Sequence, residues 1–354
     1  MLDLLRELVE IESPTYSAGV RRVAQGMASE LSALDGEVTL VEGNHLQAEF
    51  DGAGEPLLLL GHTDTVWPLG TLASMRFRVE SERAYGPGIY DMKAGLVVLV
   101  EAIRLAGNER RALRVFLTAD EEMGSATGRI WLEAATEGVA AALVVEPPTA
   151  EGHLKTARKG LGRFRITVTG RPAHAGTHRA EGVSAIQELA HQVLALHDLN
   201  DDQRGISVNV GVVRGGTSEN VVAAEAVAQV DVRIARAEDR EEVERILHGL
   251  EPVMPGATIE VDGGWTRPPL ERSPGGRAMF EQAREHGRAL GLDLREASSG
   301  GGSDGNLVGA LGIPVLDGLG AEGGGAHADD EHVVIDSLTV RAQLLARLLR
   351  KPGI

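Results

Sequence analysis

The first 150 residues alternate short apolar runs with helical patterns. Leu57–Leu60 and Ala141–Val145 are continuously apolar, Leu113–Leu117 is apolar apart from Arg114, and all three runs are only four or five residues long. Such runs are typical of strands covered on both faces of a parallel sheet. Helix-compatible stretches lie at Leu96–Leu105 and Ile130–Ala135. This alternation predicts an α/β domain with a mostly parallel sheet and helices on both faces.

The pattern changes after about Lys155, where apolar and polar residues begin to alternate one by one. Alternation of this kind predicts half-exposed strands of an antiparallel sheet, with helices against one face. The predicted strands are Phe164–Thr169, Ile206–Val210 and Val227–Ile234, and the predicted helices are Val183–Leu196 and Glu238–Leu250.

The α/β pattern of the first 150 residues returns near the end of the chain, with predicted helices at 277–290 and 336–349 and a short predicted strand at Ile313–Leu316. We therefore predict that an α+β domain, residues 157–268, is inserted into an α/β domain made of residues 1–156 and 269–354. At 354 residues the chain is long enough to bury two separate cores.

Composition narrows the classes of partner and metal site. The net charge of −17 argues against nucleic acid or an anionic membrane as a partner, since both require a basic surface. The chain has no cysteine, so a metal would be held by His, Asp and Glu. We find no signal-peptide core and no apolar run long enough to span a membrane, which predicts a cytoplasmic protein.

One acidic stretch, Thr118–Gly124, sets Asp120, Glu121 and Glu122 directly after a predicted buried strand. Adjacent carboxylates raise one another's pKa and destabilise a fold unless a cation lies among them or water surrounds them. The stretch is therefore either a solvated acidic turn or part of a cation site.

Residues of ligand type also follow the other predicted strands, and the carboxyl ends of parallel strands meet at one sheet edge. Imidazoles and carboxylates without thiolates suit a pair of zinc ions or similar divalent metals. Taken singly, each residue has a structural alternative: a core histidine, a helix cap or a loop histidine. The candidates are His62, Asp91, Glu121, Glu122, Glu146 and His327.

Seven motifs occur in series: Gly61–Val66, Gly86–Gly95, Thr118–Gly124, Glu146-Pro147, Pro172–Gly176, Asn220 with Asp231-Val232-Arg233, and the glycine run ending at His327. This series resembles the M20 metallopeptidases, and within them the glutamate carboxypeptidase type. The resemblance covers nearly the whole chain in the same order.

The resemblance implies two zinc ions, for which Co²⁺ or Mn²⁺ could substitute. His62, Asp91 and Glu146 correspond to the ligands of one ion. Asp91, Glu122 and His327 correspond to those of the other, so that Asp91 bridges the two.

The resemblance also implies roles beside the metals. Glu121 corresponds to the general base that takes a proton from the metal-bridging water and passes it to the leaving amine. Asp64 would orient His62 and fix its tautomer. Asp91-Met92 matches a position at which the family has a cis peptide. The residues alone assign no role to Asp120 or Asp304.

The inserted domain resembles the family's lid and dimerisation domain, which implies a homodimer. His174 corresponds to a histidine that reaches the partner subunit's site and stabilises the oxyanion, with Asn220 beside it. Arg267 and Arg233 are the candidates to bind a substrate carboxylate. For these residues the alternatives are a bystander histidine and solvated surface charges.

The predicted function is a dinuclear zinc hydrolase that cleaves an amide bond next to a free α-carboxylate of a small peptide or N-acyl amino acid. A carboxypeptidase that releases a C-terminal residue such as glutamate is the nearest resemblance. A deacylase of N-acyl amino acids and a small-peptide aminopeptidase remain open. A non-catalytic relative should lack a ligand or the base, and a phosphate site at Gly86-Pro87-Gly88 fits no nucleotide fingerprint.

Overall fold

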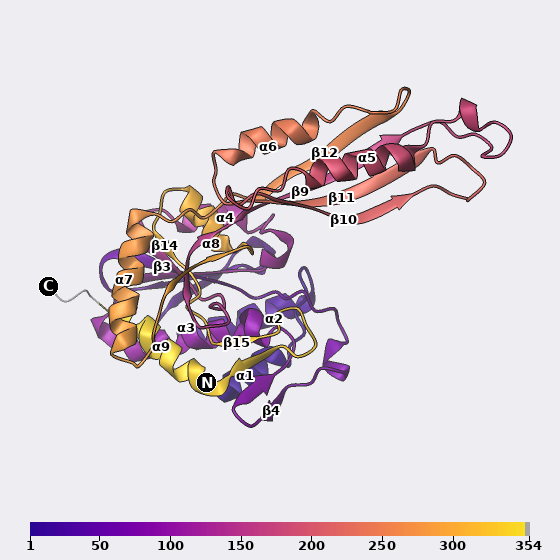
Figure 1. Cartoon of the computed structure of the whole chain (residues 1–354). Coiled ribbons are helices and arrows are strands. Elements are labelled where there is room, and N and C mark those ends of the chain that lie inside the picture. Colours follow the sequence, from indigo (N-terminus) through magenta and orange to yellow (C-terminus); the bar gives the residue numbers. More distant parts are fainter. Residues whose placement is uncertain (351–354) are drawn as a thin grey trace. The chain divides into compact units, whose positions relative to one another are not determined.

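The computed structural model describes residues 1–350, and the chain divides into two compact units. Unit 1 consists of Met1–Ala157, Arg272–Ser299 and the chain from Ser303 onward; unit 2 consists of Arg158–Glu271 and Gly300–Gly302. Each unit is described by itself below. Their secondary structure matches the expected mostly parallel α/β fold with a separate antiparallel α+β part, so the predicted fold class is confirmed (Figure 1).

Unit 1 is built on a six-stranded sheet with the order β1-β2-β6-β3-β7-β14. Strands β3, β6, β7 and β14 run parallel to one another. At one edge, β2 pairs antiparallel with β6, and β1 pairs antiparallel with β2. The predicted buried strands therefore form the centre of the sheet. The bounds are β1 Glu37–Leu40, β2 Leu46–Phe50, β3 Ala53–His62, β6 Arg111–Thr118, β7 Ala141–Val144 and β14 Val315–Leu316.

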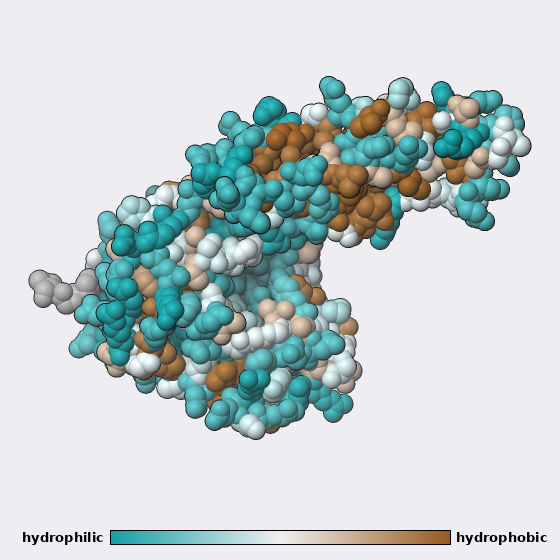
Figure 2. Space-filling model, in the orientation of Figure 1, coloured by the Kyte–Doolittle hydropathy of each residue, from teal (hydrophilic) through white to brown (hydrophobic). Residues whose placement is uncertain are grey.

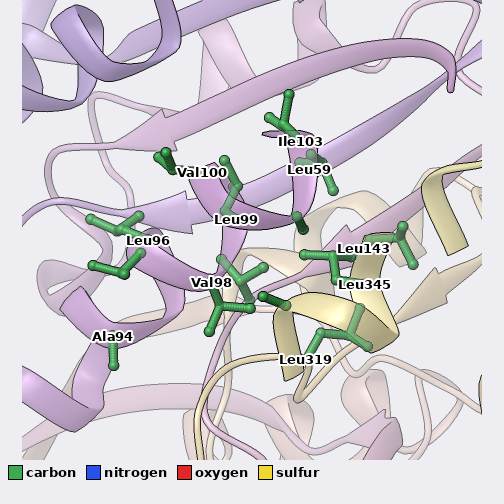
Figure 3. Packing of buried hydrophobic residues seen from close by; sticks show 14 of the residues in the cluster. Leu59, Ala94, Leu96, Val98, Leu99, Val100, Ile103, Leu143, Leu319 and Leu345 are labelled. Atoms are coloured by element: carbon green, nitrogen blue, oxygen red, sulfur yellow. The ribbon is translucent and has the colours of Figure 1, made fainter. Parts of the chain in front are cut away.

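Both faces of the central strands are buried, which explains their continuous apolar sequence. Leu57 and Leu59 belong to the main hydrophobic core, whereas Leu58 and Leu60 are equally buried but point to the opposite face. Figure 3 shows Leu59 and Leu143 packed among side chains of α3 and α9. The helices of unit 1 are α1 Leu2–Val9, α2 Ala18–Ser32, α3 Ala94–Ala106, α4 Arg129–Ala135, α7 Pro274–Arg288, α8 Asp304–Ala310 and α9 Ile335–Leu349.

Two helices cover the second face of this sheet. α4 packs on β6, and α8 packs on β3, β7 and β14. α8 begins at Asp304, after a capping box formed by Ser303 and Asn306. Small strands complete the unit: β4 Arg78–Glu80, β5 Arg83–Tyr85, β15 Gly323–Gly324 and β16 His332–Val334 form one sheet, and β8 Leu154–Arg158 pairs with β13 Glu296–Ser299.

Unit 2 is an antiparallel sheet with two helices on one face. The predicted strands and helices are confirmed, and along β9 buried and more exposed residues alternate. The sequence did not indicate β12, which carries Gly263 and Gly264 and has few buried positions. The sheet order is β10-β11-β9-β12, with β9 Gly160–Thr169, β10 Ser207–Gly215, β11 Glu225–Ile234, β12 Thr258–Arg267, α5 Ala185–His197 and α6 Asp239–His248.

Apolar side chains remain exposed on unit 2. Figure 2 shows hydrophobic residues among the hydrophilic ones on this part of the surface. Leu194 on α5 and Val213 on β10 are more than half exposed. Exposed large apolar side chains often mark surfaces that bind another protein.

At Gly95 the first turn of α3 packs closely against the backbone that follows β7. A Cβ at this position would stand 2.0 Å from the backbone oxygen of Val145. We expect Gly95→Ala to destabilise unit 1 by roughly 1–3 kcal/mol or more, because neither backbone segment can yield without moving the sheet. The midpoint of urea unfolding measures the loss.

Gly26 offers the matched control, since it is also helical and in unit 1. A Cβ there would meet only Leu8 Cδ2, at 3.9 Å. Gly26→Ala should therefore stabilise the chain by roughly 0.5–1 kcal/mol through helix propensity. Equal midpoints for the two variants would contradict the proposed close contact.

Candidate metal centre

The predicted ligands of the α/β domain come together at the carboxyl edge of the central strands. His62 is the last residue of β3 and is paired in register with Thr118, the last residue of β6. Glu121 and Glu122 follow β6 in a short helical turn, and Glu146 lies two residues beyond β7. The edge position follows from the parallel register of the three strands.

Asp91 and His327 reach the same place from loops. Asp91 lies in the turn Ile89–Lys93 that opens α3, and its peptide bond to Met92 is cis. His327 lies between β15 and β16 with φ of 62°, and its side chain is half exposed. The cis peptide agrees with the position that the motif predicts.

The carboxylate of Asp91 faces both histidines, one with each oxygen. Asp91 Oδ1 lies 3.2 Å from His62 Nε2, and Asp91 Oδ2 lies 3.5 Å from His327 Nε2. A carboxylate oriented in this way can bridge two cations.

Other carboxylates complete a group around each histidine. Glu146 Oε1 lies 3.5 Å from His62 Nε2, and Glu122 Oε1 lies 3.7 Å from His327 Nε2. Ligand atoms of His62, Asp91 and Glu122 lie within 4.8 Å of one another, and so do those of His62, Glu121 and Glu146. The second set contains Glu121, which the sequence predicted as a base.

The donor set passes a simple test of fit for divalent metal. Glu122 Oε1 is buried and has no hydrogen-bond partner among residues 1–350. Burying a carboxylate oxygen without a partner is costly unless it is paired with a cation. Imidazole nitrogens and carboxylate oxygens with no thiolate are ligands that suit zinc and similar ions.

The pKa values of the candidate ligands reflect the crowding of acidic groups around the two histidines. Burial acts to raise the pKa of Asp91, but the hydrogen-bonded imidazoles of His327 and His62 hold it well below its usual value. The neighbouring carboxylates of Asp91 and Glu122 raise the pKa of His327 to about 10. Burial acts to lower the pKa of His62, but hydrogen bonds to Asp64 and Asp91 raise it well above its ordinary value. Without metal, the site therefore holds protons on its histidines.

Asp64 ties the first histidine to the acidic turn. It is 1% exposed, and its Oδ1 lies 3.3 Å from His62 Nδ1. Its oxygens accept hydrogen bonds from the backbone N–H of Glu121 and of Glu122, both at 3.2 Å, and from the Thr15 hydroxyl at 2.7 Å. One carboxylate thus holds both the His62 ring and the turn that carries two further acids.

The structure gives Asp120 and Asp304 structural contacts that sequence alone could not assign. Asp120 accepts hydrogen bonds from Thr127 N and Gly128 N, so it holds the chain before α4. Asp304 accepts hydrogen bonds from the hydroxyls of Thr118 and Ser125. Both residues fix the backbone on either side of the acidic turn.

His45 and Glu331 also support the site and were not predicted. His45 is fully buried, and its Nδ1 accepts the backbone N–H of Ala119 at 3.0 Å. Glu331 is also fully buried and accepts a hydrogen bond from the Asp91 backbone N–H at 3.0 Å. Burial raises the pKa of Glu331 to about 7, although its hydrogen bonds act in the opposite direction.

The predicted residues of unit 2 have their own local arrangement. His174 is exposed, and its Nδ1 accepts hydrogen bonds from Gly176 N at 3.1 Å and Thr177 N at 3.2 Å. The proton of a neutral ring therefore sits on Nε2, which leaves that atom as a donor. The loop with Asn220 is adjacent, since Ala175 N donates to Asn220 O at 2.9 Å.

The two candidate arginines differ. Arg233 is paired with Asp231 through two hydrogen bonds, of 2.7 and 3.2 Å, and also donates to Gly300 O. Arg267 ends β12 and is 4% exposed, with its side chain against Gly302. Arg233 is thus already paired with a carboxylate of the chain itself.

The family profile of peptidase family M20/M25/M40 matches residues 58–351, which is most of the chain. The chain belongs to this family. The resemblance predicted from the motifs is thereby confirmed, and the chain is a hydrolase of the peptidase and amidohydrolase type.

Two similar proteins are named for different activities, a carboxypeptidase and a desuccinylase. The chain is 31% identical to carboxypeptidase G2 of Pseudomonas sp. (strain RS-16), over all of this chain and 89% of that protein. It is 26% identical to succinyl-diaminopimelate desuccinylase of Thioalkalivibrio sulfidiphilus, over 99% of this chain and 98% of that one.

Solved structures share the fold. Aminopeptidase PepT from Bacillus cereus gives a TM-score of 0.81 at 22% identity, over 98% of this chain and 96% of that one. The M20 family metallo-carboxypeptidase Sso-CP2 from Sulfolobus solfataricus gives a TM-score of 0.76 at 19% identity, over 98% of both chains.

Among residues 1–350, every helix is too short or too polar to cross a membrane.

Zinc added to the metal-free protein at pH 7 should release protons. The pKa of His327 is about 10 and that of His62 is also raised, whereas a metal binds the neutral imidazole. The apparent zinc affinity should therefore rise between pH 7 and pH 10. Calorimetric titration in two buffers of different ionisation enthalpy measures the release, and zinc binding without it would contradict these pKa shifts.

Proposed function

We propose that this chain is a hydrolase with two divalent metal ions, zinc in the first instance, that cleaves an amide bond next to a free α-carboxylate. The observation that carries the proposal is Asp91, whose two oxygens face His62 and His327 separately. Oε1 of Glu122 is buried, accepts no hydrogen bond among residues 1–350 and lies 3.7 Å from His327 Nε2, which supports a cation on the His327 side.

The ligand sets follow the two sides of Asp91. We assign His62, Asp91 and Glu146 to one ion and Asp91, Glu122 and His327 to the other. When bound, such ions lower the pKa of a water molecule towards 7 and polarise the carbonyl group under attack.

The surroundings of Glu121 support its role as the base. Its carboxylate shares a cluster within 4.8 Å with His62 and Glu146, and its backbone is fixed by Asp64. We assign it as the base that takes a proton from the attacking water. It then returns that proton to the nitrogen of the leaving amine, so that the same group serves as base and acid.

Unit 2 would supply binding groups for the substrate. His174 keeps Nε2 as a donor, which suits a hydrogen bond to the developing oxyanion, with Asn220 in the adjacent loop. For the substrate carboxylate the candidates are Arg267 and Arg233, of which Arg233 is paired with Asp231. Assembly of two chains through unit 2 remains a prediction, which its exposed Leu194 and Val213 support.

The released group is proposed to be a C-terminal amino acid such as glutamate. The 31% identity to carboxypeptidase G2 over the whole chain supports this choice. The desuccinylase relatives favour deacylation of an N-acyl amino acid as the second candidate. Both reactions break an amide between an acyl group and an amino acid, so they require the same metal site.

A panel of dipeptides and N-acyl amino acids should identify the reaction. With zinc supplied, we expect hydrolysis of substrates that carry a free α-carboxylate, and loss of at least about 100-fold in their amide or ester forms, because a charged hydrogen bond is lost. A chelator should abolish turnover and added zinc should restore it. Full activity in metal-free protein would exclude the proposal.

Glu121→Gln tests the assignment of Glu121 as the base in the same assay. We expect kcat to fall by about 10²-fold or more while metal content stays unchanged, since general acid–base catalysis contributes effects of this size. A variant that loses a metal instead would show that Glu121 is a ligand, which its cluster with His62 and Glu146 also allows.

A further inference from the structure

Glu331 has an unusual place among the acidic residues of unit 1. It lies four residues after His327, directly after the exposed Asp329 and Asp330, yet it is 0% exposed. A buried carboxylate requires hydrogen-bond donors, and the donors that surround it show which parts of the chain it connects.

Four N–H groups converge on the two carboxylate oxygens. Oε1 accepts the backbone N–H of Tyr90 at 2.9 Å and of Asp91 at 3.0 Å. Oε2 accepts the backbone N–H of Gly88 at 2.8 Å and the indole N–H of Trp67 at 2.7 Å. Every partner is a donor, so both oxygens must act as acceptors.

The backbone of Glu331 is fixed as well. Glu331 O accepts the N–H of Gly86 at 3.3 Å, and Glu331 N donates to Ala328 O at 3.0 Å. Ala328 is the residue after His327 and donates in turn to Gly325 O at 2.8 Å. A short, bonded segment therefore connects the Glu331 side chain to the loop that carries His327.

We propose that Glu331 is a positioning residue that fixes the separation between Asp91 and His327, the two groups that share one cation. Its side chain holds the backbone of Asp91, and its main chain belongs to the segment of His327. This inference rests on the proposed dinuclear site. It assigns Glu331 no contact with substrate or metal.

Glu331→Gln tests the inference with almost no change in shape. The amide NH₂ must face one of the two donor pairs, so at least two hydrogen bonds are replaced by donor–donor contacts. Residues that orient metal ligands typically affect metal affinity by about 10–100-fold. We expect a loss of this size for the zinc site of Asp91, Glu122 and His327, and a smaller loss for that of His62, Asp91 and Glu146.

Glu188→Gln is the matched control. Glu188 in unit 2 is also 0% exposed and accepts the backbone N–H of Val253 at 3.2 Å and of Met254 at 2.7 Å. It repeats the chemistry of Glu331 away from the candidate ligands. This variant should lower the thermal midpoint but leave both zinc affinities as in the unaltered chain.

The experiment is calorimetric titration of zinc into the metal-free full-length chain and the two variants. Two zinc equivalents in the unaltered chain, with one selectively weakened in Glu331→Gln, support the inference. Unchanged affinities in a folded Glu331→Gln, or equal losses at both sites, overturn it. A chain that binds no zinc overturns the proposed function and this inference with it.

Trp67→Phe provides a second route if Glu331→Gln does not fold. It removes only the indole donor to Oε2 and leaves the bonds to Tyr90 and Asp91 in place. The same zinc site should then weaken by a few-fold. Affinities identical to those of the unaltered chain would overturn the role of the carboxylate as an anchor between the loops.

Discussion

The constraint on which this site depends is the repulsion among carboxylates gathered at one edge of a sheet. Asp64, Asp91, Glu121, Glu122 and Glu146 outnumber the two imidazoles of His62 and His327 beside which they gather. The neighbouring carboxylates raise the pKa values of His62 and His327, because they stabilise positive charge on the rings. Two divalent ions would supply positive charge there, and the two oxygens of Asp91 face His62 and His327.

The surrounding fold holds these acids in place through further carboxylates that accept N–H or O–H groups. Asp64 holds the turn with Glu121 and Glu122, Asp120 holds the chain before α4, and Glu331 holds the turn with Asp91. Each acts on backbone donors, which are fixed in position by the strands and helices next to them. The chain therefore holds its candidate ligands on loops at the ends of rigid strands.

Much of this arrangement could be predicted from the sequence because strand ends are easily recognised. The buried runs that end near His62, Thr118 and Val144 indicated three candidate ligand positions, and Asp91 and His327 were candidates outside these runs. Glu331 was missed because it follows two exposed aspartates and resembles a surface residue until its donors are seen. β12 was missed because its glycines and exposed positions weaken the alternation that indicates a strand.

The central claim is that Asp91 bridges two metal ions, and it can be tested directly by crystallography. Crystals of the zinc-loaded chain should show two anomalous peaks at the zinc absorption edge, one on each side of the Asp91 carboxylate and about 3.5–4 Å apart. One peak should touch His62 and the other His327. A single peak, or two peaks that do not share Asp91, would contradict the account.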